Sequence, residues 1–176
     1  MLANLRNPNL RIFSLCFLIL TLDQISKFLV QRFLRLGEER VIIDGFFSLV
    51  YWGNTGAAWS MFQGSNTVLT IVAIIAVVAL YLNRKHFEIH HPLGQVTIGL
   101  MLGGIIGNLI DRFRVKYVID FIYFYTYQRG GGEVGFPAFN IADAAICTGV
   151  GLLLILSWRK EVPEPETNPV SAAPGS

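Results

Sequence analysis

Charge is scarce in this sequence. Asp, Glu, Lys and Arg make up 15% of its 176 residues, whereas a typical soluble domain contains about 25%. Hydrophobic residues make up 53%, and residues 45–83 contain no charged residue at all. The net charge of +2 is small and scattered, so the sequence indicates no nucleic-acid partner. This composition predicts an integral membrane protein.

Several catalytic motifs are also absent. The sequence contains no H-E-x-x-H zinc motif, and its three histidines, His86, His90 and His91, lie together in one short segment. The spacing of His86 and His90 would suit a metal ion, but a solvated loop is the commoner structure for such residues. No other histidine is present to activate a serine nucleophile. Residues 129–135 are rich in glycine but lack the Lys-Ser/Thr of a phosphate-binding loop, so we expect a flexible loop there, and neither metal nor cofactor.

Cysteine is equally rare, with only Cys16 and Cys147. Both lie inside apolar segments, where a free cysteine is commonly a small buried hydrophobic side chain. We therefore predict two buried thiols rather than a disulfide bond.

Four apolar segments have about the length of 20 residues that an α-helix needs to cross a bilayer. They are residues 11–30, 66–83, 93–111 and 139–158. We predict a mainly α membrane protein with four transmembrane helices and with both termini on one side of the membrane. One membrane domain spans residues 1–160, and the Pro-, Glu- and Ser-rich residues 161–176 are expected to be a disordered tail.

The orientation rests on a few basic residues. Arg84 and Lys85 lie in a short loop next to a predicted span, where the excess of basic residues on the cytoplasmic side is most consistent. A raw count over all loops does not favour this orientation, so only this pair argues for cytoplasmic termini.

Two segments outside the spans are rich in β-branched and aromatic residues. Residues 41–52 and 118–127 both show this composition, which is typical of strands. They belong to the two longer loops on the same side of the membrane. We expect a small β-containing platform on the outer, periplasmic side, at the level of the lipid headgroups.

Polar residues gather at the ends of the first and third spans. Asp23 and Lys27 lie one turn apart on one helical face, either closing the helix end or bracing a site. Asn108, Asp111 and Arg112 also share one helical face, at positions i, i+3 and i+4. Both a charged helix end and a bracing role suit them. Ionisable residues inside a membrane usually face the interior of the helix bundle.

Glycines recur every four residues in the third span. Gly99, Gly103 and Gly107 follow the small-xxx-small pattern of close helix contacts in membranes. We expect close helix packing here, with room for a substrate helix.

Two aspartates lie in apolar surroundings on the same predicted side. Asp143 falls in the first turn of the fourth span, on one face with Asn140, and Asp120 lies in 118-VIDFI-122. Asn54 is either a turn residue or an amide directed inward. Two carboxylates held close together share a proton, so one can activate water while the other acts as an acid. On its own, such a pair of acids is a weak signal.

Taken together, the motifs resemble those of the lipoprotein signal peptidases, also called signal peptidase II. Five matching blocks occur in the family's order between about residues 10 and 158: 23-DQISK-27, 54-NTGAAWS-60, 103-GGIIGNLIDR-112, 118-VIDF-121 and 136-FPAFNIADAAI-146. The resemblance implies a bacterial inner-membrane aspartyl endopeptidase with four spans. Such enzymes cut prolipoproteins on the amino side of a diacylglyceryl-modified cysteine.

The resemblance also implies roles for individual residues. Asp120 and Asp143 match the catalytic pair. Supporting or substrate-binding positions are matched by Asp23, Lys27, Asn54, Asn108, Asp111, Arg112 and Asn140. The implied partners are a diacylglyceryl-modified prolipoprotein, membrane lipid and inhibitors of the globomycin type.

Two other classes of protein would also place polar residues in a membrane. A small transporter or proton-conducting protein would distribute them through the depth of several spans. Residues 67–82, however, contain no polar residue apart from two Thr and one Tyr. A non-catalytic scaffold would tolerate replacement of Asp120 or Asp143 by Asn. The G-x-G-D motif of presenilin-like peptidases is absent.

Overall fold

Four long helices form the body of the protein. The computed structural model describes residues 7–56, 61–87, 89 and 91–160, so the predicted tail and His90 lie outside the described residues. The helices are α1 (Pro8–Phe33), α2 (Asn66–Asn83), α3 (Pro92–Arg114) and α4 (Ile141–Lys160), and a short 3-10 helix, η3 (Arg84–His86), follows α2. Each long helix, α2 together with η3, is long and apolar enough to cross a membrane. The four predicted spans are confirmed.

The starts of two helices are fixed locally. Pro8 and Pro92 occupy first helical positions, where a missing N–H costs nothing. The side chains of Asn7 and His91 accept hydrogen bonds from backbone N–H groups of the first turns. His91 is therefore a helix cap in this structure.

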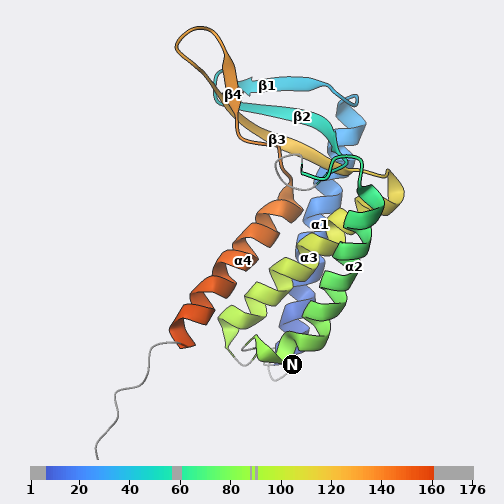
Figure 1. Cartoon of the computed structure of the whole chain (residues 1–176), viewed down its shortest axis with the longest axis vertical. Helices are drawn as coiled ribbons and strands as arrows, with labels where there is room; N and C mark the ends of the chain where they lie inside the picture. The colour runs from blue at the N-terminus through green and yellow to red at the C-terminus, as the bar shows by residue number, and fades with distance from the viewer. Residues whose placement is uncertain (1–6, 57–60, 88, 90, 161–176) are drawn as a thin grey trace, which may run out of the picture.

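One antiparallel sheet lies at a single end of the helix bundle (Figure 1). Its strands run in the order β1 (Glu39–Ile43), β2 (Phe47–Asn54), β3 (Val118–Tyr127) and β4 (Glu133–Gly135). The first residue of α1 and the last residue of α4 lie at the opposite end of the bundle. The small platform and the shared side of the described chain ends agree with the prediction.

The prediction of a flexible loop over residues 129–135 is wrong in part. Residues 133–135 form β4, which pairs with Tyr125–Tyr127 of β3. Gly130 and Gly131 both have positive φ, which lets the chain reverse direction between the two strands. Three strand residues beside a glycine turn are too few to show any periodic pattern.

Helix α3 lies between its neighbours and depends on glycine to do so. A Cβ atom at Gly103 would lie 2.8 Å from the Cys16 carbonyl oxygen of α1, and one at Gly104 would lie 2.5 Å from the Ala142 carbonyl oxygen of α4. The predicted close helix packing is confirmed. The expected room for a substrate helix is wrong at these glycines, because α1 and α4 occupy it.

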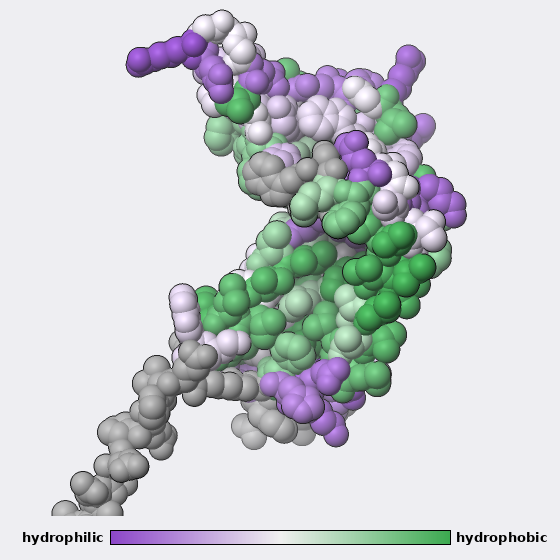
Figure 2. Space-filling view, viewed as in Figure 1, coloured by the Kyte–Doolittle hydropathy of each residue, from purple (hydrophilic) through white to green (hydrophobic). Residues whose placement is uncertain are grey.

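The rest of the bundle surface is apolar. Figure 2 shows a hydrophobic band over the helices between more polar ends. Many large side chains in this band are exposed, such as Phe17, Phe28 and Ile75. The prediction of two buried thiols holds for Cys16 only, since Cys147 is exposed on α4.

Candidate active site

A fully buried lysine joins two helices beneath the sheet. Lys27 Nζ lies 2.9 Å from Asp23 Oδ2 and 2.7 Å from Asp111 Oδ2, and it donates to Asn108 Oδ1 at 2.9 Å. All three ammonium donors are therefore used. The predicted Asp23–Lys27 pair extends from α1 to α3 and does more than close a helix end. We call Asp23, Lys27 and Asp111 the lysine cluster.

The lysine cluster also fixes the elements that carry the two candidate catalytic aspartates. Asp23 Oδ1 accepts from the Ala142 N–H at the start of α4, at 3.0 Å. Asp111 Oδ2 accepts from the Ile119 N–H of β3, at 3.2 Å. Ala142 and Ile119 directly precede Asp143 and Asp120, so the cluster positions the backbone of both aspartates.

Gln24 completes this arrangement, although it was not among the predicted site residues. Its Nε2 lies 3.1 Å from Asp23 Oδ2 and 3.2 Å from both Asp111 Oδ1 and the Gly107 carbonyl oxygen. An amide inside the polar block 23-DQISK-27 of an apolar helix was the available signal.

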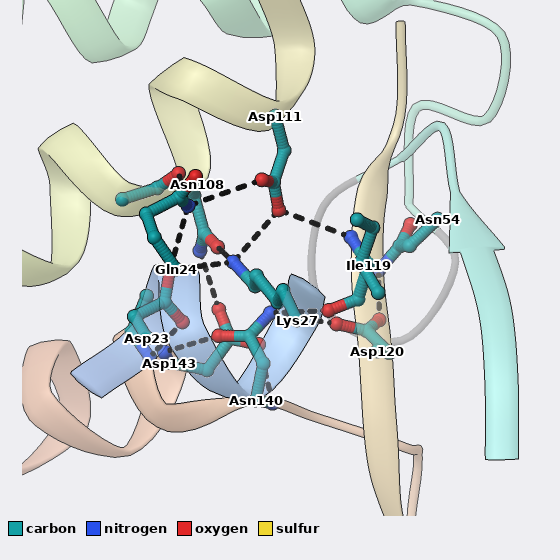
Figure 3. Close-up of polar contacts among 12 residues, drawn as sticks. Asp23, Gln24, Lys27, Asn54, Asn108, Asp111, Ile119, Asp120, Asn140 and Asp143 are labelled. Carbon is teal, nitrogen blue, oxygen red and sulfur yellow. Dashed lines mark hydrogen bonds and ion pairs between the residues drawn. The ribbon is translucent and has the colours of Figure 1, made fainter. Parts of the chain in front are cut away.

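Asp143 is held by a reciprocal cap at the start of α4. Asn140 Oδ1 accepts from the Asp143 N–H at 2.9 Å, and Asp143 Oδ2 accepts from the Asn140 N–H at 3.2 Å. This is a capping box, which fixes the side chain of the third helical residue. The other carboxylate oxygen accepts from Asn108 Nδ2 at 2.7 Å. Lys27 holds the opposite end of the same Asn108 amide (Figure 3).

Asp120 approaches from β3 and is held by two amides. Asn140 Nδ2 donates to its Oδ1 at 2.8 Å, and Asn54 Nδ2 donates to its Oδ2 at 3.1 Å. The residue is only 4% exposed. Burial, and then the nearby Asp143 carboxylate, raise the pKa of the Asp120 carboxyl to about 7, against the lowering effect of the two amide donors. Asn140 contacts both aspartates.

Both aspartates line one cavity of about 300 Å³. Asn54, Asp120 and Asp143 form its polar side. Its other walls come from the segment before α4 and from the next turn of α4, and are mainly apolar: Phe136, Pro137, Ala138, Phe139, Ile146 and Cys147. Within the described residues, no group of three or more His, Cys, Asp or Glu is placed to hold a metal ion. A pair of carboxyl groups beside an apolar wall can carry out acid–base chemistry on an apolar substrate.

Arg112 does not orient the two aspartates directly. Its guanidinium donates to the Gly56 carbonyl oxygen at 2.7 Å and to Asn66 Oδ1 at 3.2 Å. It therefore fixes the segment after β2 to the start of α2. Among the other residues matched to supporting roles, Asn54, Asn108 and Asn140 touch an aspartate of the cavity, while Asp23, Lys27 and Asp111 act from one shell further out.

Comparison with known proteins identifies the group to which this arrangement belongs. Residues 15–159 match the family described as signal peptidase (SPase) II. This chain belongs to that family. A lipoprotein signal peptidase of Anoxybacillus flavithermus is 37% identical over 147 residues, covering 84% of each chain. One from Syntrophotalea carbinolica is 40% identical over 145 residues, covering 81% of this chain and 87% of that relative.

Solved structures agree with the membership. A structure of a bacterial membrane enzyme superposes with a TM-score of 0.74 at 29% identity, covering 89% of this chain and 93% of the other. A second bacterial membrane enzyme gives a TM-score of 0.66 at the same identity. As a member of the signal peptidase II family, the chain is a multi-pass membrane peptidase that takes part in the processing of prolipoprotein signal peptides.

Proposed function

We propose that this chain is an aspartyl endopeptidase that cuts prolipoproteins on the amino side of a diacylglyceryl-modified cysteine. The observation that carries the proposal is that Asp120 and Asp143, from separate elements, line one cavity and share contacts with Asn140. A buried pair of carboxyl groups favours the state with one proton, because two adjacent charges are costly in a medium of low polarity. That state contains both the acid and the base that peptide hydrolysis needs.

The hydrolysis follows from this pair without a covalent intermediate. The ionised carboxylate takes a proton from water, and the water oxygen attacks the scissile carbonyl carbon. The protonated carboxyl group donates a hydrogen bond to the developing oxyanion and then helps to protonate the leaving amine as the C–N bond breaks. Asn54, Asn108 and Asn140 hold both carboxyl groups in place through these steps.

The position of the pair suits a substrate in the membrane. Asp143 lies at the start of a membrane-length helix, and Asp120 lies in the sheet that covers that end of the bundle. A lipid-modified cysteine that follows an apolar signal helix presents its scissile bond at the same level. The mainly apolar cavity wall supports binding of acyl chains or of a lipopeptide inhibitor such as globomycin.

The orientation proposed is that of a bacterial inner-membrane protein with cytoplasmic termini and an outward active site. The short basic segment with Arg84 and Lys85 lies at the end of the bundle opposite the sheet and supports it.

The test is cleavage of a purified diacylglyceryl-modified prolipoprotein in detergent by wild type, Asp120→Asn and Asp143→Asn at equal folded yield. The unlipidated prolipoprotein is the matched control substrate. Cleavage of the lipidated form alone, with both variants inactive, supports the pair and the substrate class together.

Two results would contradict the proposal in different ways. Activity near that of wild type in either variant would show that the assigned pair is wrong, and Asp111 and Asp23 would be tested next. Absence of cleavage by folded wild type, without any ion gradient, would favour a transporter or a scaffold.

A further inference from the structure

A second cavity lies at the outer end of α1, away from the candidate active site. It has a volume of about 180 Å³ and shares no lining residue with the catalytic cavity. Its lining is apolar apart from one arginine: Leu29, Val30, Phe33, Leu34 and Leu49, with Arg40 of β1. This volume accommodates several methylene groups of a hydrocarbon chain.

Arg40 is directed toward this cavity by the sheet register. Arg40 and Leu49 are paired residues of β1 and β2, so their side chains lie on the same face of the sheet. Glu39 precedes Arg40 in the strand and therefore points to the other face. Glu38 accepts a hydrogen bond from the Arg35 N–H. In the part of the chain that the structure describes, the Arg40 guanidinium has neither an ion pair nor a hydrogen-bond partner.

We expect the cavity to lie at the level of the lipid headgroups, because it lies where the membrane-length helix α1 ends. Leu29 and Phe33 belong to the last turns of a helix long enough to cross a membrane, and both are exposed, Phe33 by 71%. Arg40 belongs to the sheet beyond that end of α1 (Figure 1). An arginine at this level, with apolar surface below it and no protein counter-ion, can extend its guanidinium to the membrane interface. There it can bind a phosphate group through bidentate hydrogen bonds.

We propose that this cavity binds an anionic glycerophospholipid such as phosphatidylglycerol. One acyl chain lies against Leu29, Phe33 and Leu49, and the lipid phosphate contacts Arg40. Arg32 and Arg35 are exposed at the same end of α1 and add positive charge to the surroundings. The site goes beyond the proposed peptidase function, because it needs neither the catalytic aspartates nor the prolipoprotein. It gives a role to basic residues that lie on the sheet side of the membrane, where the usual charge bias does not explain them.

Lipid binding to the full-length protein in a neutral detergent tests the proposal without any use of catalysis. Delipidated wild type is titrated with palmitoyl-oleoyl phosphatidylglycerol or with phosphatidylcholine of the same chains, and native mass spectrometry gives the dissociation constant of the first bound lipid. We expect wild type to bind phosphatidylglycerol about fivefold more tightly, since one basic residue near an anionic surface contributes about 1 kcal/mol.

Three variants separate the headgroup from the acyl chain. Arg40→Gln is expected to lose the preference for phosphatidylglycerol. Arg129→Gln, which removes an exposed arginine outside the cavity lining, is the matched control and keeps the preference. Leu29→Trp fills the cavity from an exposed position and weakens binding of both lipids about fivefold or more. Gel filtration and thermal melting confirm that each variant is folded.

Each contrary result overturns a stated part of the proposal. Unchanged phosphatidylglycerol binding by Arg40→Gln removes the headgroup contact, and unchanged binding of both lipids by Leu29→Trp removes the acyl site. If Arg40→Gln leaves lipid binding unchanged but raises KM for the lipidated prolipoprotein, the cavity belongs to the substrate and the proposal is wrong. Failure of the proposed peptidase function would leave these binding results unaffected.

Discussion

Two pairs of carboxylates lie at the same end of this helix bundle, and their surroundings differ. Asp23 and Asp111 share the ammonium group of Lys27, at 2.9 and 2.7 Å. Asp120 and Asp143 receive hydrogen bonds from neutral side-chain amides and from one backbone N–H. Asp23, Asp111 and Asp120 are buried and Asp143 is half-buried, and Asp120 and Asp143 line the cavity.

Under the proposed function, this difference separates structural carboxylates from the reactive pair, Asp120 and Asp143. The Lys27 ammonium group lies between the two acids of the first pair, and oxygens of these acids also hold the backbone N–H groups of Ala142 and Ile119. Neutral amides orient a carboxyl group without supplying a counter-charge, and in the proposed mechanism the second pair then holds the one proton that is transferred. The lysine cluster thus supplies rigidity to a pair that has no ion-pair partner among the described residues.

The largest effect on activity is expected when one aspartate of the reactive pair is replaced by asparagine. Asp120→Asn should reduce kcat/KM for the lipidated prolipoprotein by at least about 1000-fold, the range of general acid–base catalysis. The same variant should be more stable than wild type at pH 8. The folded-state pKa of Asp120 is raised from 3.8 to about 7, so the native wild type loses stability as pH rises between these values, and Asn removes this loss.

Melting temperatures at pH 4 and pH 8 check the sign of this effect. The difference between Asp120→Asn and wild type should be small near pH 4 and should grow toward pH 8, since each unit of pKa shift corresponds to about 1.4 kcal/mol. A variant that is less stable than wild type at pH 8 would contradict the assignment of Asp120 as a carboxyl group with a raised pKa.

The opposite outcome is expected when the lysine cluster loses its cation. Lys27→Met leaves Asp23 and Asp111 buried without a counter-charge, a change that typically costs about 3–5 kcal/mol. The folded yield in detergent should fall steeply, before any question of activity arises. Adding Asp111→Asn to Lys27→Met removes one of the two charges and should restore part of the yield. A Lys27→Met variant that folds normally would show that the cluster is not structural.

A glycine substitution tests the same cluster more gently. A Cβ atom at Gly107 would lie 2.6 Å from Asp23 Oδ2, the oxygen that contacts Lys27 and Gln24. Gly107→Ala should therefore destabilise the protein by about 1–3 kcal/mol through overpacking. Gly151→Ala on α4 is the matched control, because among the described residues no atom beyond its own helical neighbours lies within 4 Å of the added Cβ. The control should be neutral or slightly stabilising, and equal melting temperatures for the two variants would refute the proposed contact.

Much of the fold could be predicted because apolar length and strand composition are local signals. Helix α2 spans residues 66–83 as predicted. A single apolar segment in a membrane can satisfy its backbone hydrogen bonds within itself only as a helix. Residues 118–127 form β3 for the same local reason, as a β-branched and aromatic segment. Strand β4 escaped prediction, because its pairing with β3 depends on a glycine turn rather than on its own composition.

The candidate site was predictable in its members but not in their connections. Polar residues in apolar helices stand out, so Asp23, Lys27 and Asn108 were found. Arg112 binds Gly56 and Asn66, and this contact depends on the path of a segment far away in the sequence. The spacing of residues along α3 does not reveal that path. Cys147 lies one helical turn after Asp143, and this spacing could have placed it in the cavity wall.

The smallest effect expected is a shift in the pH profile when one amide is removed from the reactive pair. In wild type, kcat/KM should fall as pH rises through about 7, because the pair then loses its shared proton. Asn54 donates to Asp120 Oδ2, which stabilises the ionised form and lowers the pKa. Asn54→Ala should therefore raise this pKa and move the alkaline limb to higher pH by about one unit.

The control for this shift must be a variant that loosens the segment after β2 but removes no contact with Asp120. Asn54 also accepts from the Gly56 N–H, so its removal affects the backbone after β2. Thr55 accepts a hydrogen bond from the Gly64 N–H in that segment and is not a partner of Asp120, so Thr55→Ala should leave the alkaline limb in place. If both variants shift the limb equally, backbone movement is the cause. If Asn54→Ala shifts it to lower pH, the Asn54 amide does not stabilise the ionised carboxylate, and the contrast between amide-held and lysine-held acids loses its physical basis.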